Sequence, residues 1–68
     1  MEGKVKSFSK RHGYGFIVGD QGEVFFFHAT EWKPPIPAFP GNEVEFDPII
    51  TEKGSRATNV RRLRHGKK

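Results

Sequence analysis

The fold of this chain is determined by two short runs and the turn between them: Tyr14-Gly15-Phe16-Ile17-Val18, Gly19-Asp20-Gln21-Gly22 and Val24-Phe25-Phe26-Phe27-His28. Successive side chains of a β-strand point to opposite faces, so Phe25 and Phe27 share one face of the second run while Phe26 lies on the other. Glycine and aspartate between the runs favour a tight reversal of the chain. These residues therefore predict a β-hairpin with aromatic side chains on both faces.

The same period of two continues outside this hairpin, and no run of ten residues has a helical stripe. Short runs predict three further strands, at residues 4–8, 43–46 and 56–63. We expect Pro48 to limit the fourth strand, and turns at residues 9–13 and 51–55. The prolines between residues 33 and 41 exclude a central strand there and favour a stiff loop. Five short antiparallel strands with a long connection after the third predict an all-β fold, closed or partly open as a barrel, because closure hides strand edges.

A chain of 68 residues has room for one domain with a small core. Ordering it costs on the order of 100 kcal/mol, at about 1.5 kcal/mol per residue, so we expect marginal stability. The alternation assigns these residues to the core: Val5, Ile17, Phe25, Phe27, Val44, Phe46 and Val60.

The other face of the hairpin gathers Tyr14, Phe16, Phe26 and His28. A barrel this small cannot bury both faces, so we expect these side chains to be exposed together, although burial of the rings is the alternative for any one of them. Stacking of a base on an aromatic ring contributes about 1 to 3 kcal/mol, so an exposed aromatic face favours binding of single-stranded nucleic acid. A contact role for His28 is one of several that its position allows.

Charge is distributed unevenly along the chain, whose net charge is +4. Residues 56–68 contain six Lys and Arg and no acidic residue, and residues 1–11 are also basic. We expect the two ends to converge on one face that meets a polyanion, with Glu43, Glu45 and Asp47 facing elsewhere. The cations expected to follow a nucleic-acid backbone are Lys6, Lys10, Arg11, Lys53 and Arg56.

Several kinds of function have no support in the residues. The chain has no cysteine, and its histidines at 12, 28 and 65 lack metal-ligand spacing, so we expect no metal site and no cofactor. No phosphate-binding loop or nucleophile paired with a base is present, so we expect no enzyme and no small-molecule substrate. No apolar run is long enough for a membrane span or a secretory signal, and the cytoplasm is the expected location.

The run from His12 to Val18 resembles the first ribonucleoprotein motif in its centre. Together with the other motifs in their order, it makes the chain similar to a cold shock domain over about residues 2–63; those motifs are Gly3–Lys6, Val24–Thr30 and Gly54–Val60. The resemblance implies a five-stranded oligonucleotide-binding (OB-fold) barrel spanning residues 1–64, followed by a basic tail at residues 65–68.

The resemblance also implies roles for single residues. Lys6 and Phe8 match contact positions on the first strand, and Lys53 matches a cation near the nucleic-acid path. The stacking positions are matched by Tyr14, Phe16, Phe26 and His28 when His28-Ala29-Thr30 is aligned with the family's His-Phe-Ser. A shift by one residue would place Phe25 and Phe27 on the binding face in place of Phe26.

Three positions depart from the family's pattern: Ser7 stands where an exposed tryptophan is usual, His12 where a lysine is usual, and Ala29 where a phenylalanine is usual. Each lost ring is expected to weaken binding by roughly 10-fold to several hundred-fold. Phe39, in the proline-rich loop, is the candidate for a compensating ring. Trp32 falls where the family has a buried aliphatic residue and is expected in the core.

The resulting hypothesis is a monomeric binder of single-stranded RNA or DNA that acts as a passive RNA chaperone. Binding of unpaired bases would draw weak hairpins open without nucleotide hydrolysis. A dimer formed by strand exchange remains open. The alternative is a small barrel that uses the same aromatic face for a protein partner or for self-association.

Overall fold

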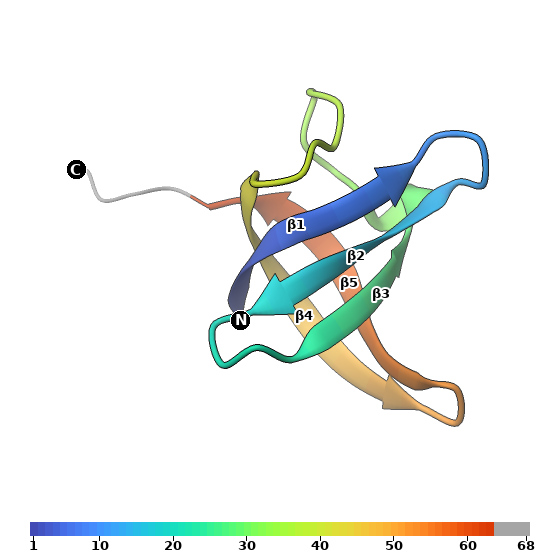
Figure 1. The fold of residues 1–68 in the computed structure, drawn as a ribbon, viewed down its shortest axis with the longest axis vertical. Helices are drawn as coiled ribbons and strands as arrows, with labels where there is room; N and C mark the ends of the chain where they lie inside the picture. Colours follow the sequence, from blue (N-terminus) through green and yellow to red (C-terminus); the bar gives the residue numbers. More distant parts are fainter. Residues whose placement is uncertain (64–68) are drawn as a thin grey trace.

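Five strands form the architecture in the computed structural model, which describes residues 1–63 (Figure 1). They are β1 Glu2–Ser9, β2 Tyr14–Gly19, β3 Val24–His28, β4 Glu43–Thr51 and β5 Gly54–Arg62, with a single 3-10 turn, η1 Ala29–Glu31, after β3. The second and third strands begin at the predicted residues, and the other three are longer than expected. The tail predicted at residues 65–68 lies outside the described residues.

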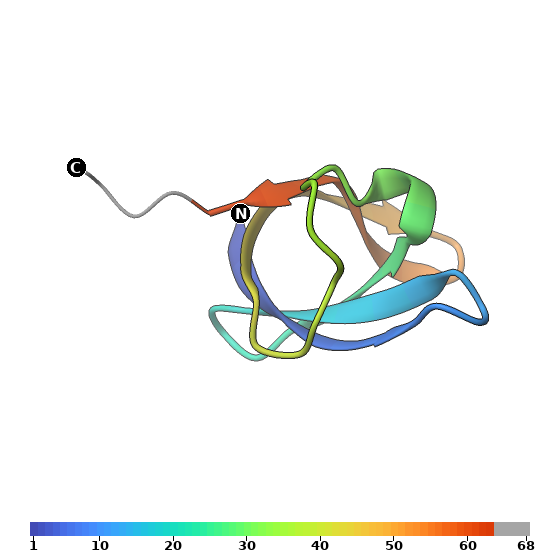
Figure 2. The same ribbon diagram turned by 90° about the horizontal axis from the view of Figure 1, so that it is seen from above.

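The strands close into a barrel in the order β1-β2-β3-β5-β4, with β1 pairing to β4 (Figure 2). The closed all-β fold is therefore confirmed. All neighbouring strands are antiparallel except β3 and β5, which run parallel where Phe26 pairs with Arg56. The expectation of antiparallel pairing throughout fails at this junction for a geometric reason. Directions cannot alternate all the way around a closed ring of five strands, so one pair must run parallel.

β2 and β3 form the predicted hairpin, in which Phe16 pairs with Phe26. Gly19 N–H donates to the Glu23 carbonyl at 2.7 Å and closes the turn. Gly22 takes φ +86, a conformation that residues with a Cβ rarely adopt. The turn between the two runs is therefore formed by the glycines that predicted it.

A bulge in β1 changes which side chains face the barrel interior. Val5 pairs with Ile17 and Ser7 pairs with Phe16, so Lys6 is an extra residue without a partner on β2. Because of this extra residue, Ser7 lies on the outer side of the sheet beside Phe16, and Phe8 pairs with the buried Gly15.

The prediction that Pro48 limits the fourth strand is wrong. β4 continues through Pro48, which pairs with Ala57 on β5, and the turn is confined to residues 52–53. Pairing of β4 with β1 ends at Glu45, so the later part of β4 has a neighbour on one side only. A proline is tolerated in such an edge segment, because no strand there requires its missing N–H.

The core matches the predicted set and adds one residue. All seven predicted residues are buried, and Ala57 joins them. Phe25 contacts Phe46 with ring centroids 5.0 Å apart, and Phe8 stacks on Phe27 at 5.7 Å. Burying these rings provides most of the favourable free energy that a chain of this length can obtain.

The proline-rich segment contains no strand and crosses one end of the barrel (Figure 2). Trp32 packs against the core, and its indole N–H donates to the Ile36 carbonyl at 2.7 Å. At the other end of the segment, Val5 N–H donates to the Asn42 carbonyl at 2.9 Å, and Gly41 N–H donates to the Val5 carbonyl at 2.8 Å. The loop is thus attached to the barrel on both sides, and Trp32 is half-buried against the core and not part of it.

Candidate nucleic-acid interface

The outer side of β2 and β3 carries a cluster of rings that we call the aromatic face: Tyr14, Phe16, Phe26 and His28. Phe16 pairs with Phe26 and Tyr14 pairs with His28, so the four side chains form two adjacent rows. The intervening residues of both strands point into the core, as the alternation predicted. The cluster is therefore a direct consequence of a two-sided aromatic hairpin.

The three large rings of this face are half-buried rather than fully exposed, and none belongs to the buried core. The ring centroid of Phe26 lies 5.3 Å from that of Tyr14 and 5.9 Å from that of Phe16, and Tyr14 lies 6.1 Å from Phe16. The contacts of Phe16 with both neighbours are edge-to-face, a favourable arrangement for aromatic rings. Each ring shields part of the next, so the rings form one continuous apolar surface.

His12 extends this surface, a contribution that the sequence analysis missed. Its ring centroid lies 5.7 Å from that of Tyr14, and its Nδ1 lies 2.8 Å from Ser9 Oγ. Ser9 Oγ also accepts a hydrogen bond from the His12 N–H at 3.2 Å, which fixes the turn before β2. The signal was present in the sequence as an aromatic residue two positions before Tyr14.

His28 is exposed on β3, across from Tyr14. Its Nδ1 accepts from the Thr30 N–H at 3.2 Å and lies 3.0 Å from Thr30 Oγ1. Through these contacts with Thr30, His28 acts as the N-cap of η1, and its imidazole is oriented. One edge of the ring is therefore occupied by the protein, while the side chain as a whole remains open to solvent.

The predicted cations are placed at three locations around the face. Lys6 is the bulged residue of β1, Lys10 and Arg11 are in the turn between β1 and β2, and Lys53 is in the turn between β4 and β5; all four are exposed. Arg56 differs from them, because it is half-buried and its guanidinium carbon lies 5.4 Å from the Phe26 ring centroid. Arg56 is thus the predicted cation that the structure brings into contact with the aromatic face.

Phe8 and Phe39 are not brought into this cluster. Phe8 stacks on Phe27 with an interplanar angle of 15°, on the inner side of the sheet, as a result of the bulge at Lys6. Phe39 is 59% exposed in the proline-rich loop, where its N–H donates to Asn42 Oδ1 at 2.8 Å. Phe39 therefore presents an open ring on a constrained loop, whereas Phe8 supports the core.

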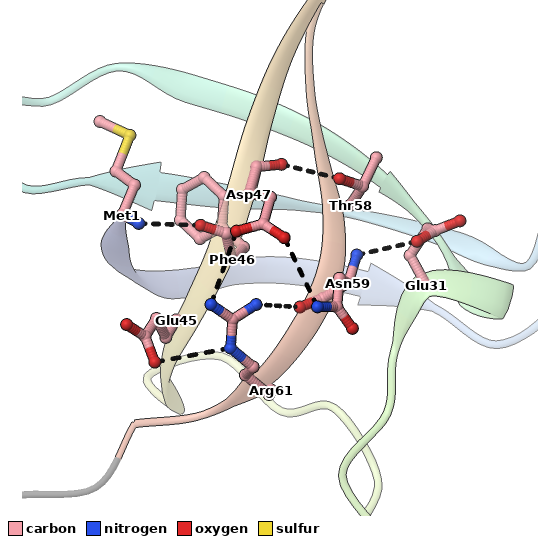
Figure 3. A network of polar contacts seen from close by, with 8 residues as sticks. All are labelled: Met1, Glu31, Glu45, Phe46, Asp47, Thr58, Asn59 and Arg61. Carbon is pink, nitrogen blue, oxygen red and sulfur yellow. Dashed lines mark hydrogen bonds and ion pairs between the residues drawn. The ribbon is translucent and has the colours of Figure 1, made fainter.

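The charge arrangement on β4 and β5 corrects one expectation. Arg61 Nε lies 3.5 Å from Glu45 Oε1, and its Nη2 lies 3.5 Å from Asp47 Oδ1 (Figure 3). Its Nη1 also donates to the Asn59 carbonyl at 2.8 Å. The basic end of the chain thus lies directly beside the acidic strand, because Glu45 and Arg61 are partners in the β4–β5 ladder. The expectation that these acidic residues face away from the basic ends is wrong at Arg61.

The described part of the chain has neither a metal-binding cluster nor a membrane-spanning helix. Among residues 1–63, no group of histidine and acidic side chains is arranged to hold a metal ion. Within the same residues, no helix has the length and apolar character needed to cross a membrane.

Comparison with known proteins gives a consistent result. The family model of the 'Cold-shock' DNA-binding domain matches residues 1–63. A cold shock-like protein of Thermotoga maritima is 40% identical over 63 residues, which cover 90% of this chain and 96% of that protein. A cold shock-like protein of Aquifex aeolicus is 44% identical over 68 residues, covering 93% of this chain and 94% of that protein.

Longer proteins contain a similar segment. Y-box-binding protein 3 of Homo sapiens is 43% identical over 65 residues, which cover 85% of this chain. The chain spans 18% of that protein and 22% of Y-box-binding protein 1 of Xenopus laevis. Among solved structures, drosophila Unr CSD456 superposes with a TM-score of 0.72 at 30% identity, covering 93% of this chain and 26% of the Unr chain.

Proposed function

Because the chain belongs to the cold-shock DNA-binding domain family, a family of nucleic-acid-binding domains, we propose that it binds single-stranded RNA or DNA on the aromatic face. The observation on which this proposal rests is the outward cluster of Tyr14, Phe16 and Phe26, whose rings lie within about 6 Å of one another and remain half-exposed. A single strand offers unstacked bases that can lie on such rings, whereas bases in a duplex are already stacked.

The exposed cations provide the second part of the interaction. Lys6, Lys10 and Arg11 lie on β1 and in the turn that leads into the aromatic face, and Lys53 lies three residues before Arg56. Their charges would neutralise phosphates without selecting a base sequence. The binding mode supported by these groups is base stacking in the centre and phosphate contacts at the rim.

The biochemical consequence we propose is a passive RNA chaperone activity. Binding to unpaired segments lowers the free energy of the open state, so weak hairpins shift towards the open form without a chemical step. We further propose that the protein acts as a monomer in the cytoplasm. Its binding domain would span residues 1–64, and a basic tail would follow.

The aromatic face allows a direct test of this function. Fluorescence anisotropy of labelled thymidine and uridine hexamers should show saturable binding, and a duplex of six base pairs should compete at least 10-fold more weakly. Trp32 is a poor reporter, because its indole packs on Phe27 at 5.9 Å and bonds to the loop. A label on the oligonucleotide is therefore preferable to intrinsic emission.

The outcome of this comparison distinguishes single-stranded nucleic-acid binding from a protein-interaction function of the same face. Preferential binding of the single strand supports the proposal. Equal binding of single strand and duplex, or no binding of either, would contradict it and would favour the protein-interaction alternative for the same face.

A further inference from the structure

Arg56 occupies a position on the aromatic face that its place in the sequence does not indicate. It is the β5 residue that pairs with Phe26 at the parallel junction of β3 and β5. Its guanidinium carbon lies 5.4 Å from the Phe26 ring centroid, within the range of a cation–π contact. The guanidinium therefore covers part of the Phe26 ring in the aromatic face, and Tyr14 and Phe16 contact the same ring.

The donors of Arg56 are not used by the protein. No hydrogen bond or ion pair of its side chain occurs within residues 1–63, and its Nε is shut off from solvent without a partner. Arg61, on the same strand, makes the opposite use of its guanidinium, since it bonds to the Asn59 carbonyl and approaches Glu45 and Asp47 (Figure 3). Nε is closed to a ligand in this arrangement, so the donors that Arg56 offers to acceptors of a ligand are its Nη groups, which have no partner within residues 1–63.

We propose that Arg56 is a specificity-determining residue that selects guanine in a bound single strand, an inference that rests on the proposed function. A guanidinium over the Phe26 ring lies close to the layer that a base would occupy when stacked on Tyr14, whose ring is tilted by 37° from that of Phe26, whereas the Phe16 ring stands edge-on to Phe26 at 71°. In that layer the fork of donors faces the edge of the base. Of the four major-groove edges, the one with two acceptors at the spacing of an arginine fork is that of guanine, with O6 and N7, whereas cytosine has two adjacent acceptors, N3 and O2, on its Watson–Crick edge.

The other bases offer a poorer match to this fork. Adenine places an amino group beside N7, and cytosine also presents an amino donor, so a donor would face a donor. Thymine and uracil offer one carbonyl oxygen on the corresponding edge. Arg56 therefore discriminates by hydrogen bonding, while the rings beneath accept any base.

A phosphate is the competing partner for an arginine fork. The exposed Lys6, Lys10, Arg11 and Lys53 are better placed for phosphates, because they are open to solvent at the rim. Arg56 is half-buried against a ring, and its Nε is excluded from solvent. This placement favours a contact of Arg56 with a base over a contact with a backbone phosphate.

The test compares thymidine hexamers in which one position in turn carries guanine, adenine, inosine or 7-deazaguanine. Inosine keeps O6 and N7, whereas 7-deazaguanine lacks the N7 acceptor. At the position beside Arg56, guanine and inosine should bind roughly 5- to 150-fold more tightly than adenine, the discrimination typical of one bidentate pair. The 7-deaza base should lose most of this gain.

Two variants separate base selection from charge. Arg56→Lys keeps the positive charge but has no fork, so it should lose the preference for guanine over adenine. Lys10→Gln, a rim variant, should weaken all hexamers equally and keep the preference. The ratio of affinities for guanine and adenine is measured within one protein sample, so it does not depend on the fraction that is folded.

Three results would overturn the inference. Equal affinity for guanine and adenine at every position would exclude base selection. Retention of a guanine preference by Arg56→Lys would assign that preference to other residues. A uniform loss across all hexamers in Arg56→Gln, with a salt dependence shallower by about 0.7, would assign Arg56 to a phosphate. In each of these cases the hexamers still bind, whereas failure of the proposed function would abolish preferential single-strand binding altogether.

Discussion

Phe16 and Phe26 occupy the centre of the aromatic face, since they pair across β2 and β3 and each contacts Tyr14. Their rings face outward, and the same strands bury Ile17 and Phe27 on the other side. A substitution on the outer side therefore removes contact area for a ligand without opening a cavity in the core. This separation makes the function of single residues testable apart from the stability of the fold.

Phe16→Ala and Phe26→Ala should each weaken binding of a thymidine hexamer by about 1 to 3 kcal/mol, because each removes one stacking surface. Anisotropy titrations would measure the change, and circular dichroism would check that the fold is retained. Ile50→Ala is the matched control, because Ile50 is 79% exposed on β4 and lies outside the aromatic face. Affinities unchanged in both phenylalanine variants would refute the stacking mechanism.

Ser7→Trp should increase affinity. Ser7 is exposed and pairs with Phe16 on the outer side of the sheet, where cold shock domains usually carry a tryptophan. An added ring there would extend the stacking surface and should strengthen binding of the same hexamer by about 1 to 3 kcal/mol. Ser7→Ala, which adds no ring, should leave the affinity unchanged. A weaker or unaltered affinity for Ser7→Trp would show that bound bases do not pass this position.

At the scale of elements, the packing of β1 on the β2–β3 hairpin depends on the bulge at Lys6 and on the small residue at position 15. The bulge turns Phe8 to the inner side, where it stacks on Phe27 above Gly15. A Cβ at position 15 would collide with the Ser7 carbonyl oxygen and lie 2.8 Å from a Phe27 ring carbon. The hairpin was predicted from its own residues, whereas the inward turn of Phe8 was not, because an extra residue in one strand reverses the alternation after it.

Gly15→Ala should therefore destabilise the fold by about 1 to 3 kcal/mol, the usual cost of overpacking. For a domain of this size each kcal/mol lowers Tm by roughly 4 to 8 °C. Thermal unfolding followed by circular dichroism would measure the shift, with Ser7→Ala as the neighbouring control. An unchanged Tm would mean that β1 and β3 are less tightly packed than the structure indicates.

The molecule as a whole has a charge distribution more mixed than the sequence suggested. Arg61 lies against Glu45 and Asp47, so one cation of the basic end is partly neutralised. Lys6, Lys10, Arg11 and Lys53 remain exposed. These exposed groups, rather than the net charge of +4 alone, offer contacts to phosphates.

The logarithm of affinity should fall linearly with the logarithm of salt concentration, with a slope of about −0.7 for each phosphate contacted on a single strand. Lys10→Gln and Arg11→Gln should each make the slope shallower by about 0.7. Lys10→Arg keeps the charge and should keep the slope. Affinity independent of salt would exclude phosphate contacts at the rim.

Local alternation was sufficient to determine the hairpin, the seven core residues and the outward direction of Tyr14, Phe16 and Phe26, because the faces of a strand follow from its own sequence. Only the tertiary structure placed Arg56 over Phe26, thirty residues away, and Arg61 beside Asp47. These contacts depend on which strands become neighbours, on the parallel junction that five strands require, and on the bulges of β1 and β5 that shift the strand registers. Such relations are set by closure of the whole barrel, so no single segment of the chain contains them.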